Sequence, residues 1–372
     1  MMRLLAFVQK RPGISPGQRF RLEQWLPHLR DTHGIEVELC AFESPRLTEV
    51  LYTPGKVLTK GAWMLHDFAR RADAVRLARD FDGAIVYREV ATLGPAIWER
   101  VLSRLDVPFL LDFDDAIWMP ASNAPRPVNG VFSRLRFPAK THTIARLARA
   151  VTVGNEFLAD WARGHNDNVH IVPTSIDLDR YTVQPERPDD DVFVLGWMGS
   201  HSTVPNLEVV REAVERFGAR RKTRFVVVCD VPLKPAFRNV ENVFVRWSGD
   251  REAADIGAMH VGIMPLGDYA FARGKCGCKA LQYMAAGRPS VLSPIGVNAE
   301  IVHHDENGLH ATSTAEWLEA FERLATSSEL RRRLATAGRR TVEDGYSATA
   351  AASKFAAAIE SMLPRQAATG TG

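Results

Sequence analysis

Residues 261–289 read VGIMPLGDYAFARGKCGCKALQYMAAGRP, and this stretch decides the fold that the sequence predicts. It opens with a short apolar run, turns at Gly267 and Gly274, and continues as an amphipathic helical pattern that ends at Gly287. An apolar strand followed by a turn and a helix is the repeating unit of a parallel sheet covered by helices. Because the same alternation recurs before and after this stretch, we expect an α/β protein.

Twelve short apolar runs are candidate strands, and stretches of helical period separate them. The expected strands cover residues 4–8, 35–41, 83–87, 108–112, 150–153, 170–172, 192–198, 224–230, 242–246, 261–265, 290–293 and 308–311. The expected helices of the first half cover residues 18–30, 62–80, 95–105, 132–149 and 156–164.

A polar stretch interrupts this alternation about halfway along the chain. Residues 182–190 read TVQPERPDD, and prolines among charged residues continue neither a strand nor a helix. We therefore place a linker there, between an N-terminal domain at 1–181 and a C-terminal domain at 191–345. Residues 346–372 are expected to form a last, alanine-rich helix and a disordered tail. At roughly 150 residues per domain, a length of 372 agrees with two domains.

The composition excludes several classes of protein. A hydrophobic content of 46% with 24% charged residues is typical of a globular protein and excludes disordered, collagen-like and coiled-coil chains. The net charge of +3 is too small and too dispersed for a nucleic-acid-binding protein, so no nucleic acid partner is expected. Four cysteines at these spacings predict neither a disulfide framework nor a zinc site.

The apolar runs also bear on location. The run at 4–8 is far shorter than a signal peptide needs, and no run approaches the roughly 18 residues of a membrane span. We therefore expect a cytoplasmic protein. Basic residues interrupt the helical pattern at 132–149: Arg134, Arg136, Lys140, Arg146 and Arg149. Peripheral contact with the inner membrane surface stays open, beside the alternative of a core-facing helix with a basic outer side.

A first candidate site follows the strand at 192–198, since ligands of parallel sheets bind at the carboxyl ends of strands. Thr203, two residues before Pro205, fits a helix N-cap. Backbone amides around Gly199, Ser200 and Thr203 would then hold a phosphate at the helix start. The alternative is an ordinary turn with a capping threonine.

A second candidate site is a group of cations, Arg273, Lys275 and Lys279, after the strand at 261–265. Lys275 and Lys279 are four positions apart, so a helical first turn would put both on one face. Three cations at a helix N-terminus suit a diphosphate, and a solvated basic face is the alternative. The stretch is not a P-loop, because the glycine spacing is wrong and Cys276 stands where a Ser or Thr belongs.

A third candidate site is a group of carboxylates, Asp112, Asp114 and Asp115, at the end of the strand at 108–112. Such crowding is costly unless cations or hydrogen bonds compensate it. Three roles are open: positioning a substrate hydroxyl, binding a metal ion or, for Asp112, capping the amides at 13–17. In the loop after the first strand, Arg19 or Arg21 could reach a substrate or be ordinary helix residues.

Together these motifs resemble the nucleotide-sugar half of GT-B-fold glycosyltransferases of the family 4, or glycosyltransferase group 1, type. The motifs are GWMGS at 196–200, IMPL at 263–266, RGKC at 273–276, the helix at 279–289 and SPIGVN at 293–298. In the first half, LDFDDAIW at 111–118, VTVGN at 151–155 and PTSID at 173–177 are similar to the acceptor domain of that family. The resemblance spans residues 1 to about 363.

The resemblance implies two Rossmann-like domains that face a cleft, with the C-terminal helix crossing back to the N-terminal domain. The C-terminal domain would bind the donor through Gly199, Ser200, Thr203, Arg273, Lys275, Lys279, Gln282 and Asn298. Many members carry two glutamates separated by seven residues, and these positions are Gly274 and Gln282 here. The amide of Gln282 is left to contact a ribose, whereas Gly274 supplies no carboxylate to the donor sugar.

The resemblance also implies the activity. A sugar would pass from a nucleoside-diphosphate sugar to the hydroxyl of a carbohydrate or lipid-linked acceptor, with retention and without a metal ion or any other cofactor. Asp114 and Asp115 would position the acceptor, Lys279 would stabilise the leaving diphosphate, and the diphosphate itself would take the acceptor proton. The alternatives are a non-catalytic nucleotide- or sugar-binding protein and a nucleotide-sugar epimerase of the same fold.

Overall fold

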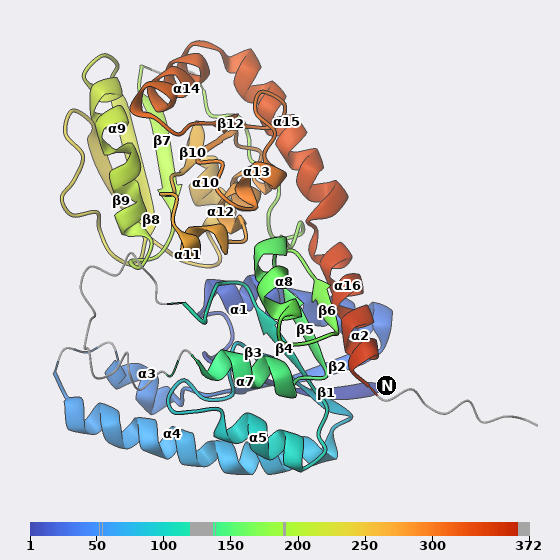
Figure 1. Ribbon diagram of the computed structural model, residues 1–372. Helices are drawn as coiled ribbons and strands as arrows, with labels where there is room; N and C mark the ends of the chain where they lie inside the picture. The colour runs from blue at the N-terminus through green and yellow to red at the C-terminus, as the bar shows by residue number, and fades with distance from the viewer. Residues whose placement is uncertain (52, 54, 120–136, 138, 189–190, 364–372) are drawn as a thin grey trace, which may run out of the picture. The chain divides into compact units, whose positions relative to one another are not determined.

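A computed structural model describes residues 1–51, 53, 55–119, 137, 139–188 and 191–363 (Figure 1). The chain divides into two compact units: Met1–Pro173 with Ala351–Gly372 form unit 1, and Thr174–Ala350 form unit 2. The start of the helix expected at 132–149, two residues of the expected linker (189–190) and the tail from 364 lie outside the described residues. Over the described ranges, no helix is both long and apolar enough to cross a membrane.

Unit 1 is built on a six-stranded sheet in which all pairings are parallel. Its strands, in the order β2-β1-β3-β4-β5-β6, are β1 (Met2–Val8), β2 (Ile35–Ala41), β3 (Gly83–Tyr87), β4 (Phe109–Phe113), β5 (Ala150–Val153) and β6 (Val169–Ile171). Its helices are α1 (Pro16–Arg21), η1 (Glu23–Trp25), α2 (Leu26–His33), α3 (Pro45–Leu51), α4 (Val57–Leu77), η2 (Ala78–Asp80), α5 (Ile97–Arg104), α7 (Lys140–Leu147) and α8 (Glu156–Arg163).

Unit 2 repeats this architecture with a second six-stranded parallel sheet. Its strands, in the order β12-β11-β10-β7-β8-β9, are β7 (Phe193–Met198), β8 (Thr223–Cys229), β9 (Glu241–Arg246), β10 (Val261–Met264), β11 (Ser290–Leu292) and β12 (Leu309–His310). Its helices are η3 (Val204–Val210), α9 (Arg211–Gly218), α10 (Glu252–Gly257), α11 (Ala270–Arg273), α12 (Cys278–Ala285), α13 (Asn298–Ile301), α14 (Thr314–Thr326) and α15 (Ser328–Gly345).

The last helix, α16 (Ala348–Met362), begins at the end of unit 2 and lies for most of its length in unit 1. There Phe355 packs on Trp25, with ring centroids 5.0 Å apart. Its alanines give it a narrow apolar face, and this face is buried in unit 1. The C-terminal helix therefore returns to the unit that holds the N-terminus, as the family resemblance implies.

The burial of the strands explains why the apolar runs are continuous. Every residue of β3 and of β7 is buried, because helices cover both faces of a parallel sheet. The edge strand β9 differs, since it alternates exposed and half-buried residues and leaves Phe244 41% exposed. Central strands therefore read as unbroken hydrophobic stretches, and edge strands do not.

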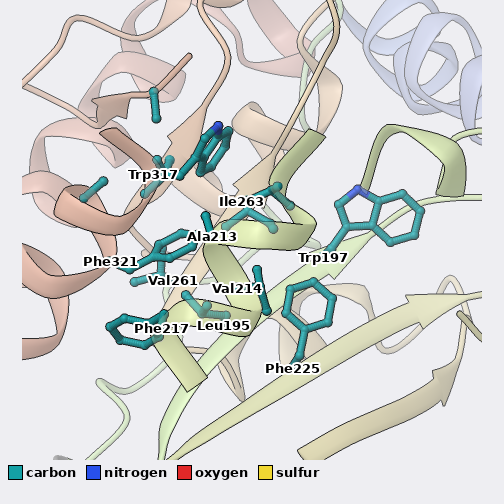
Figure 2. Packing of buried hydrophobic residues seen from close by; sticks show 14 of the residues in the cluster. Leu195, Trp197, Ala213, Val214, Phe217, Phe225, Val261, Ile263, Trp317 and Phe321 are labelled. Atoms are coloured by element: carbon teal, nitrogen blue, oxygen red, sulfur yellow. The ribbon is translucent and has the colours of Figure 1, made fainter. Parts of the chain in front are cut away.

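The core of unit 2 lies between its sheet and the helices α9 and α14 (Figure 2). Phe321 of α14 packs on Phe217 of α9, with ring centroids 5.6 Å apart, and Trp317 packs on Phe321, with ring centroids 5.8 Å apart. Leu195 and Ile263 project from the sheet into the same cluster. Each of these fully buried large side chains contributes roughly 1.5–3 kcal/mol to folding, so this cluster holds the second sheet to its helices.

All twelve expected strands are present, each within two residues of its expected bounds, which confirms the α/β prediction. The helix expected at 18–30 is divided into α1, η1 and α2. It breaks at Leu22, whose φ of −145° is not helical, and Pro27 lies in the first turn of α2, where a helix tolerates a proline because the nitrogen there needs no hydrogen to donate. Helix α3 was not expected from the sequence.

Two further expectations need correction. Lys140 was expected on a basic outer face, but it is buried and donates to the carbonyl of Ala91 (2.7 Å) beside the carboxylate of Glu89 (2.6 Å). Unit 2 begins at Thr174, ahead of the linker expected at 182–190. The reason is that Ile176 forms a bridge with Ser347, which ties the segment before the expected linker to unit 2.

Candidate functional site

The strand order of unit 2 contains a switch point between β7 and β10. From β7 the chain builds outward to β8 and β9, and it then returns to the other side of β7 to add β10, β11 and β12. At such a point the loops after two neighbouring strands diverge and leave room for a ligand at their carboxyl ends. The loops after β7 and β10 are the ones that carry the predicted donor residues.

The loop after β7 is held by its own hydrogen bonds. The amide of Gly199 donates to the carbonyl of Val228 (3.0 Å), and that of Ser200 donates to the hydroxyl of Thr203 (3.2 Å). The amide of His201 donates to Asp230 (2.7 Å). Thr203 is the N-cap residue, as expected, but its hydroxyl turns back to the carbonyl of Ser200 (3.0 Å) and does not cap the helix. The expectation of open amides for a phosphate is therefore not met in this arrangement.

The side chain of Lys279, near the start of α12, lies over that of Trp197, near the end of β7. The Lys279 ammonium lies 5.8 Å from the centroid of the Trp197 ring. A Cβ on Gly199 would collide with the same ring and lie 2.8 Å from the hydroxyl oxygen of Thr203. The structure thus brings together Gly199, Thr203 and Lys279 around a tryptophan that the sequence analysis did not single out.

The other two predicted cations lie apart from Lys279. Helix α12 begins only at Cys278, after Gly277 in the left-handed conformation (φ 67°). Lys275 therefore lies in the preceding turn, with its ammonium 4.6 Å from the centroid of the Phe271 ring. Arg273 ends α11 and pairs with Asp268 (3.0 Å), and both side chains are exposed. The prediction of Lys275 and Lys279 on one helix face is wrong, because the turn at 274–277 separates them.

Gln282 is buried within α12, and its amide is already bonded. Its Nε2 donates to the hydroxyl oxygen of Tyr181 (2.6 Å), and that hydroxyl donates to Glu252 (2.7 Å). Burial, with the neighbouring Glu252 carboxylate, raises the pKa of Tyr181 well above its ordinary value. The contact between Gln282 and Tyr181 fixes the start of the 182–190 segment to α12, and the contact expected between Gln282 and a ribose stays a prediction.

Asn298 lies fully buried at the start of α13. Its Nδ2 donates to the carbonyl of Ser293 (3.2 Å), whereas its Oδ1 has no hydrogen-bond partner among the described residues. That oxygen lies 3.5 Å from the position of a Cβ on Gly277. A Cβ on Gly296 would lie 2.6 Å from the carbonyl oxygen of Arg273. The loop after β11 therefore packs closely on the turn at 274–277.

In unit 1, the predicted carboxylates lie at the end of β4 and are held by Arg88. The Arg88 guanidinium contacts Asp114 (2.6 Å) and Asp115 (2.9 Å), and the Tyr87 hydroxyl donates to Asp114 (3.1 Å). Burial of Arg88 opposes its charge, but Asp114, Tyr87 and Asp115 raise the pKa of Arg88 well above its ordinary value. Gly17 approaches this group so closely that a Cβ there would lie 3.0 Å from Asp114. The guanidinium of Arg88 thus compensates the negative charges of Asp114 and Asp115, as crowded carboxylates require.

Asp112 has a separate, structural role. It pairs with the buried guanidinium of Arg21 and accepts from Thr152 (2.7 Å), while Arg21 also donates to the carbonyl of Val172. Burial raises the pKa of Asp112, and Arg21 opposes that shift. The alternatives of Asp112 capping the amides at 13–17 and of Arg21 reaching a substrate are therefore wrong. Arg19 is also buried, with its guanidinium 4.7 Å from the Phe20 ring centroid.

Three site features escaped the sequence analysis: Trp197, Tyr181 and Arg88. Trp197 lies within an apolar, strand-like run, and the pattern of that run indicated only that Trp197 is a core residue. Arg88 has a positive φ of 66°, which the sequence does not reveal in a non-glycine residue. A basic residue directly after the strand at 83–87 was the available signal. Across the described ranges, no group of three or more His, Cys, Asp or Glu side chains could hold a metal ion.

Comparison with known protein families finds a match for the part of the chain that contains these loops. Residues 192–327 match the family described as "Glycosyl transferases group 1". No curated protein sequence matches the chain.

Solved structures share the fold over nearly the whole chain. Sucrose-phosphate synthase from Thermosynechococcus elongatus is 14% identical, with a TM-score of 0.69 over 97% of this chain and 98% of that one. A glycosyltransferase from Rickettsia africae ESF-5 is 13% identical, with a TM-score of 0.66 over 98% and 99%. HepE of Anabaena in complex with UDP and glucose is 13% identical, with a TM-score of 0.63 over 97% and 100%. The two parallel-sheet units are those of GT-B structures.

Proposed function

We propose that this chain, which has the GT-B fold, is a glycosyltransferase of the group 1 type, and we infer from this the reaction that it performs. It transfers a sugar from a nucleoside-diphosphate sugar to an acceptor hydroxyl, with retention of the anomeric configuration and without a divalent metal ion. The donor binds to unit 2 and the acceptor to unit 1.

The observation that carries this proposal is the position of Lys279. Its ammonium lies over Trp197, beside Gly199, at the switch point of the second sheet. A ring face attracts an ammonium and so helps to hold it in place. When the glycosidic bond breaks, negative charge develops on the leaving diphosphate, and a preorganised cation there stabilises the transition state. Lys275 supplies further positive charge in the neighbouring turn, and Arg273, now paired with Asp268, would have to exchange that partner for the donor.

The remaining predicted donor residues shape this site. Ser200 and Thr203 hold the loop after β7 in a compact turn, and Gly199 lets the Trp197 ring lie against it. Gln282 fixes Tyr181, so its role is to orient α12. Asn298 brings a buried oxygen, which has no hydrogen-bond partner within the described part of the chain, to the turn that precedes Lys279. Donor binding is proposed to rearrange this turn, so that the ligand and the oxygen of Asn298 gain new partners.

In unit 1, Asp114 and Asp115 position the acceptor hydroxyl. Arg88 holds both carboxylates at the end of β4 and compensates their mutual repulsion. A leaving diphosphate oxygen takes the proton of the acceptor hydroxyl on the face where the new bond forms. The acceptor is a carbohydrate, free or lipid-linked, and the reaction takes place in the cytoplasm, including the inner membrane surface.

The experiment begins with donor binding. Because HepE was solved with UDP and glucose, UDP-glucose heads a panel of nucleotides and nucleotide sugars tested by thermal shift. A ligand at about 100 times its Kd stabilises the protein by roughly 2.7 kcal/mol. The donor that stabilises is then incubated with sugar acceptors, and proton NMR reads the anomeric configuration of the first product. Inversion would overturn the retaining proposal, and no shift with any nucleotide would overturn the donor site.

A second candidate is a protein that binds a nucleotide or sugar without turnover. Gly274 and Gln282 favour it, since neither brings a carboxylate to the donor and the Gln282 amide is bonded to Tyr181. Release of nucleoside diphosphate separates the two candidates: a binding protein takes up the donor but never cleaves it.

A further inference from the structure

Unit 2 contains a cavity of about 400 Å³, which lies at the end of the sheet opposite to the candidate donor site. Its wall is formed by residues 183–187, by the residues just before β10 and β11, and by one face of α15. Since the strands are parallel, this places the cavity at the amino ends of β10 and β11, whereas Lys279 lies beyond the carboxyl ends. We call it the arginine cavity.

Arginines that are fixed by backbone carbonyls build this cavity. Arg288 donates to the carbonyls of Met259 (2.9 Å), Gln184 (3.1 Å) and Gly257 (2.7 Å). Arg339 donates to the carbonyls of Tyr181 and Ala285, both at 2.6 Å. A carbonyl oxygen satisfies a guanidinium hydrogen but brings no formal charge to neutralise it. These side chains are thus held rigidly while their positive charges persist.

The charge balance of the wall is strongly positive. Six arginines and two glutamates line the cavity, which leaves a formal excess of four positive charges. The glutamates are already paired, Glu186 with Arg332 (3.3 Å) and Glu343 with Arg339 (2.6 Å). His260 adds no charge, because its Nδ1 accepts from the amide of Val194 (2.9 Å) and its Nε2 therefore donates to the carbonyl of Pro188 (3.1 Å). Burial, together with the charge of Arg187, lowers the pKa of Arg288.

The rest of the wall is apolar. Val183, Met259, Pro289 and Ala335 line the cavity between the charged groups. The volume lies within the roughly 300–1,000 Å³ of small-molecule sites, which combine an apolar wall with a few polar groups. A bare inorganic anion would leave this apolar surface unused.

We propose that the arginine cavity is a second ligand site, which binds a small phosphorylated organic molecule with an apolar body. The planar guanidinium fork matches the oxygens of a phosphate, and the excess charge attracts a dianion. The ligand would bridge Arg187, in the segment after Tyr181, and Arg340, which is exposed on α15. Its apolar body would pack on Met259 and Ala335. This inference does not depend on the proposed transfer reaction.

The test uses phenyl phosphate, a phosphate with an apolar ring, and isothermal titration calorimetry of the full chain at low salt. We expect wild type to bind it more tightly than inorganic phosphate, and the double variant Arg187→Gln/Arg340→Gln to bind it at least about tenfold more weakly. Ala335→Glu, which removes no arginine and adds a negative charge to the wall, should weaken binding similarly. Thermal unfolding without ligand confirms that each variant is folded.

Two control variants locate the site. Arg220→Gln removes an exposed arginine of the same unit outside the cavity and should leave the affinity unchanged. Lys279→Ala should also leave it unchanged, because its side chain belongs to the candidate donor site. Loss of phenyl phosphate binding in Lys279→Ala would place the anion at the donor site and overturn the proposal. So would unchanged affinity in folded cavity variants, or no binding to wild type at millimolar ligand.

Discussion

At the scale of single residues, the candidate site is a set of charges, and their partners decide what each can do. Arg273 is paired with Asp268, and Arg88 with Asp114 and Asp115. Lys279 lies with its ammonium 5.8 Å from the centroid of the Trp197 ring, at the end of β7. Because this position is at the switch point of the second sheet, Lys279 is the predicted cation that we propose to meet the developing anion.

Lys279→Ala should lower kcat by about a hundredfold to a thousandfold, as loss of one transition-state contact typically does. Lys279→Arg should restore activity only in part, because a planar fork replaces a compact ammonium. Steady-state kinetics with the identified donor measures both effects. Lys222→Ala, an exposed lysine of the same unit, is the matched control. Wild-type kcat in the Lys279→Ala variant would remove Lys279 from the catalytic role.

Asp114→Asn and Asp115→Asn should lower kcat by up to about a hundredfold through a misplaced acceptor, and leave nucleotide affinity nearly unchanged. We expect kcat to change without nucleotide affinity because the carboxylates belong to unit 1 and the predicted donor residues to unit 2. Kinetics and nucleotide titration are compared with Asp73→Asn, an exposed carboxylate on α4. If both variants keep wild-type kcat, the two aspartates serve only to hold Arg88.

At the scale of elements, the start of α12 sets the position of Lys279. Gly277 precedes this helix with a φ of 67°, and a Cβ there would collide with Ile301 of α13. The turn from Arg273 to Gly277 therefore follows a path that only glycine permits at its last residue.

Gly277→Ala should destabilise unit 2 by roughly 1–2 kcal/mol from the left-handed backbone alone, with an added cost from Ile301. It should also weaken donor binding, because the turn must shift. Chemical denaturation and nucleotide titration check these outcomes. Gly345→Ala is the control, since no atom lies within 4 Å of a Cβ there. Equal stability of the two variants would contradict the strain argument.

Helix α14 begins with a capping box between Ser313 and Glu316. Hydrogen bonds from Thr312 and Ser313 lower the pKa of Glu316 to about 2. Because the folded pKa lies below the ordinary value near 4.3, the stabilisation is present above that value and is lost as pH falls toward 2.

Ser313→Ala should therefore destabilise the protein by about 1 kcal/mol. Glu316→Gln should lower the Tm at pH 7, and the difference from wild type should narrow as pH falls from 6 to 3.5. Thermal unfolding across this range checks it, with Glu319→Gln on the same helix as control. A difference that stays constant with pH would show that the carboxylate charge contributes nothing.

At the scale of the whole molecule, both units are built on a six-stranded parallel sheet, and they differ in the chemistry at the carboxyl ends of their strands. Unit 2 brings Lys279 and a tryptophan to that edge, and unit 1 brings an arginine with two carboxylates at the end of β4. Protein cations can compensate a diphosphate without a metal ion.

Full activity in excess EDTA is therefore expected, with no gain on adding Mn²⁺ or Mg²⁺. Initial rates measured after dialysis against the chelator check this. Activity abolished by EDTA and restored by Mn²⁺ would overturn the metal-independent mechanism and reduce the lysines to an exposed basic face.

The sequence alone determined the α/β class and the twelve strands, and it predicted which loops after those strands carry the candidate site residues. It could do so because continuous apolar runs and helical periods are local signals, and a buried parallel strand is read from its own residues. Gly274 also marked the turn, although the left-handed φ of Gly277 and the shortened helix behind it were not foreseen.

Only the tertiary structure decided which side chains meet. Arg21 pairs with Asp112, 91 positions away, and Gln282 bonds to Tyr181, 101 positions away. A local period shows which face of an element is buried, but it carries no information about which distant residue packs against that face. For this reason Arg21 and Gln282 were predicted as ligand contacts and proved to have protein partners, while the Trp197 ring beneath Lys279 emerged only when the ends of β7 and α12 came together.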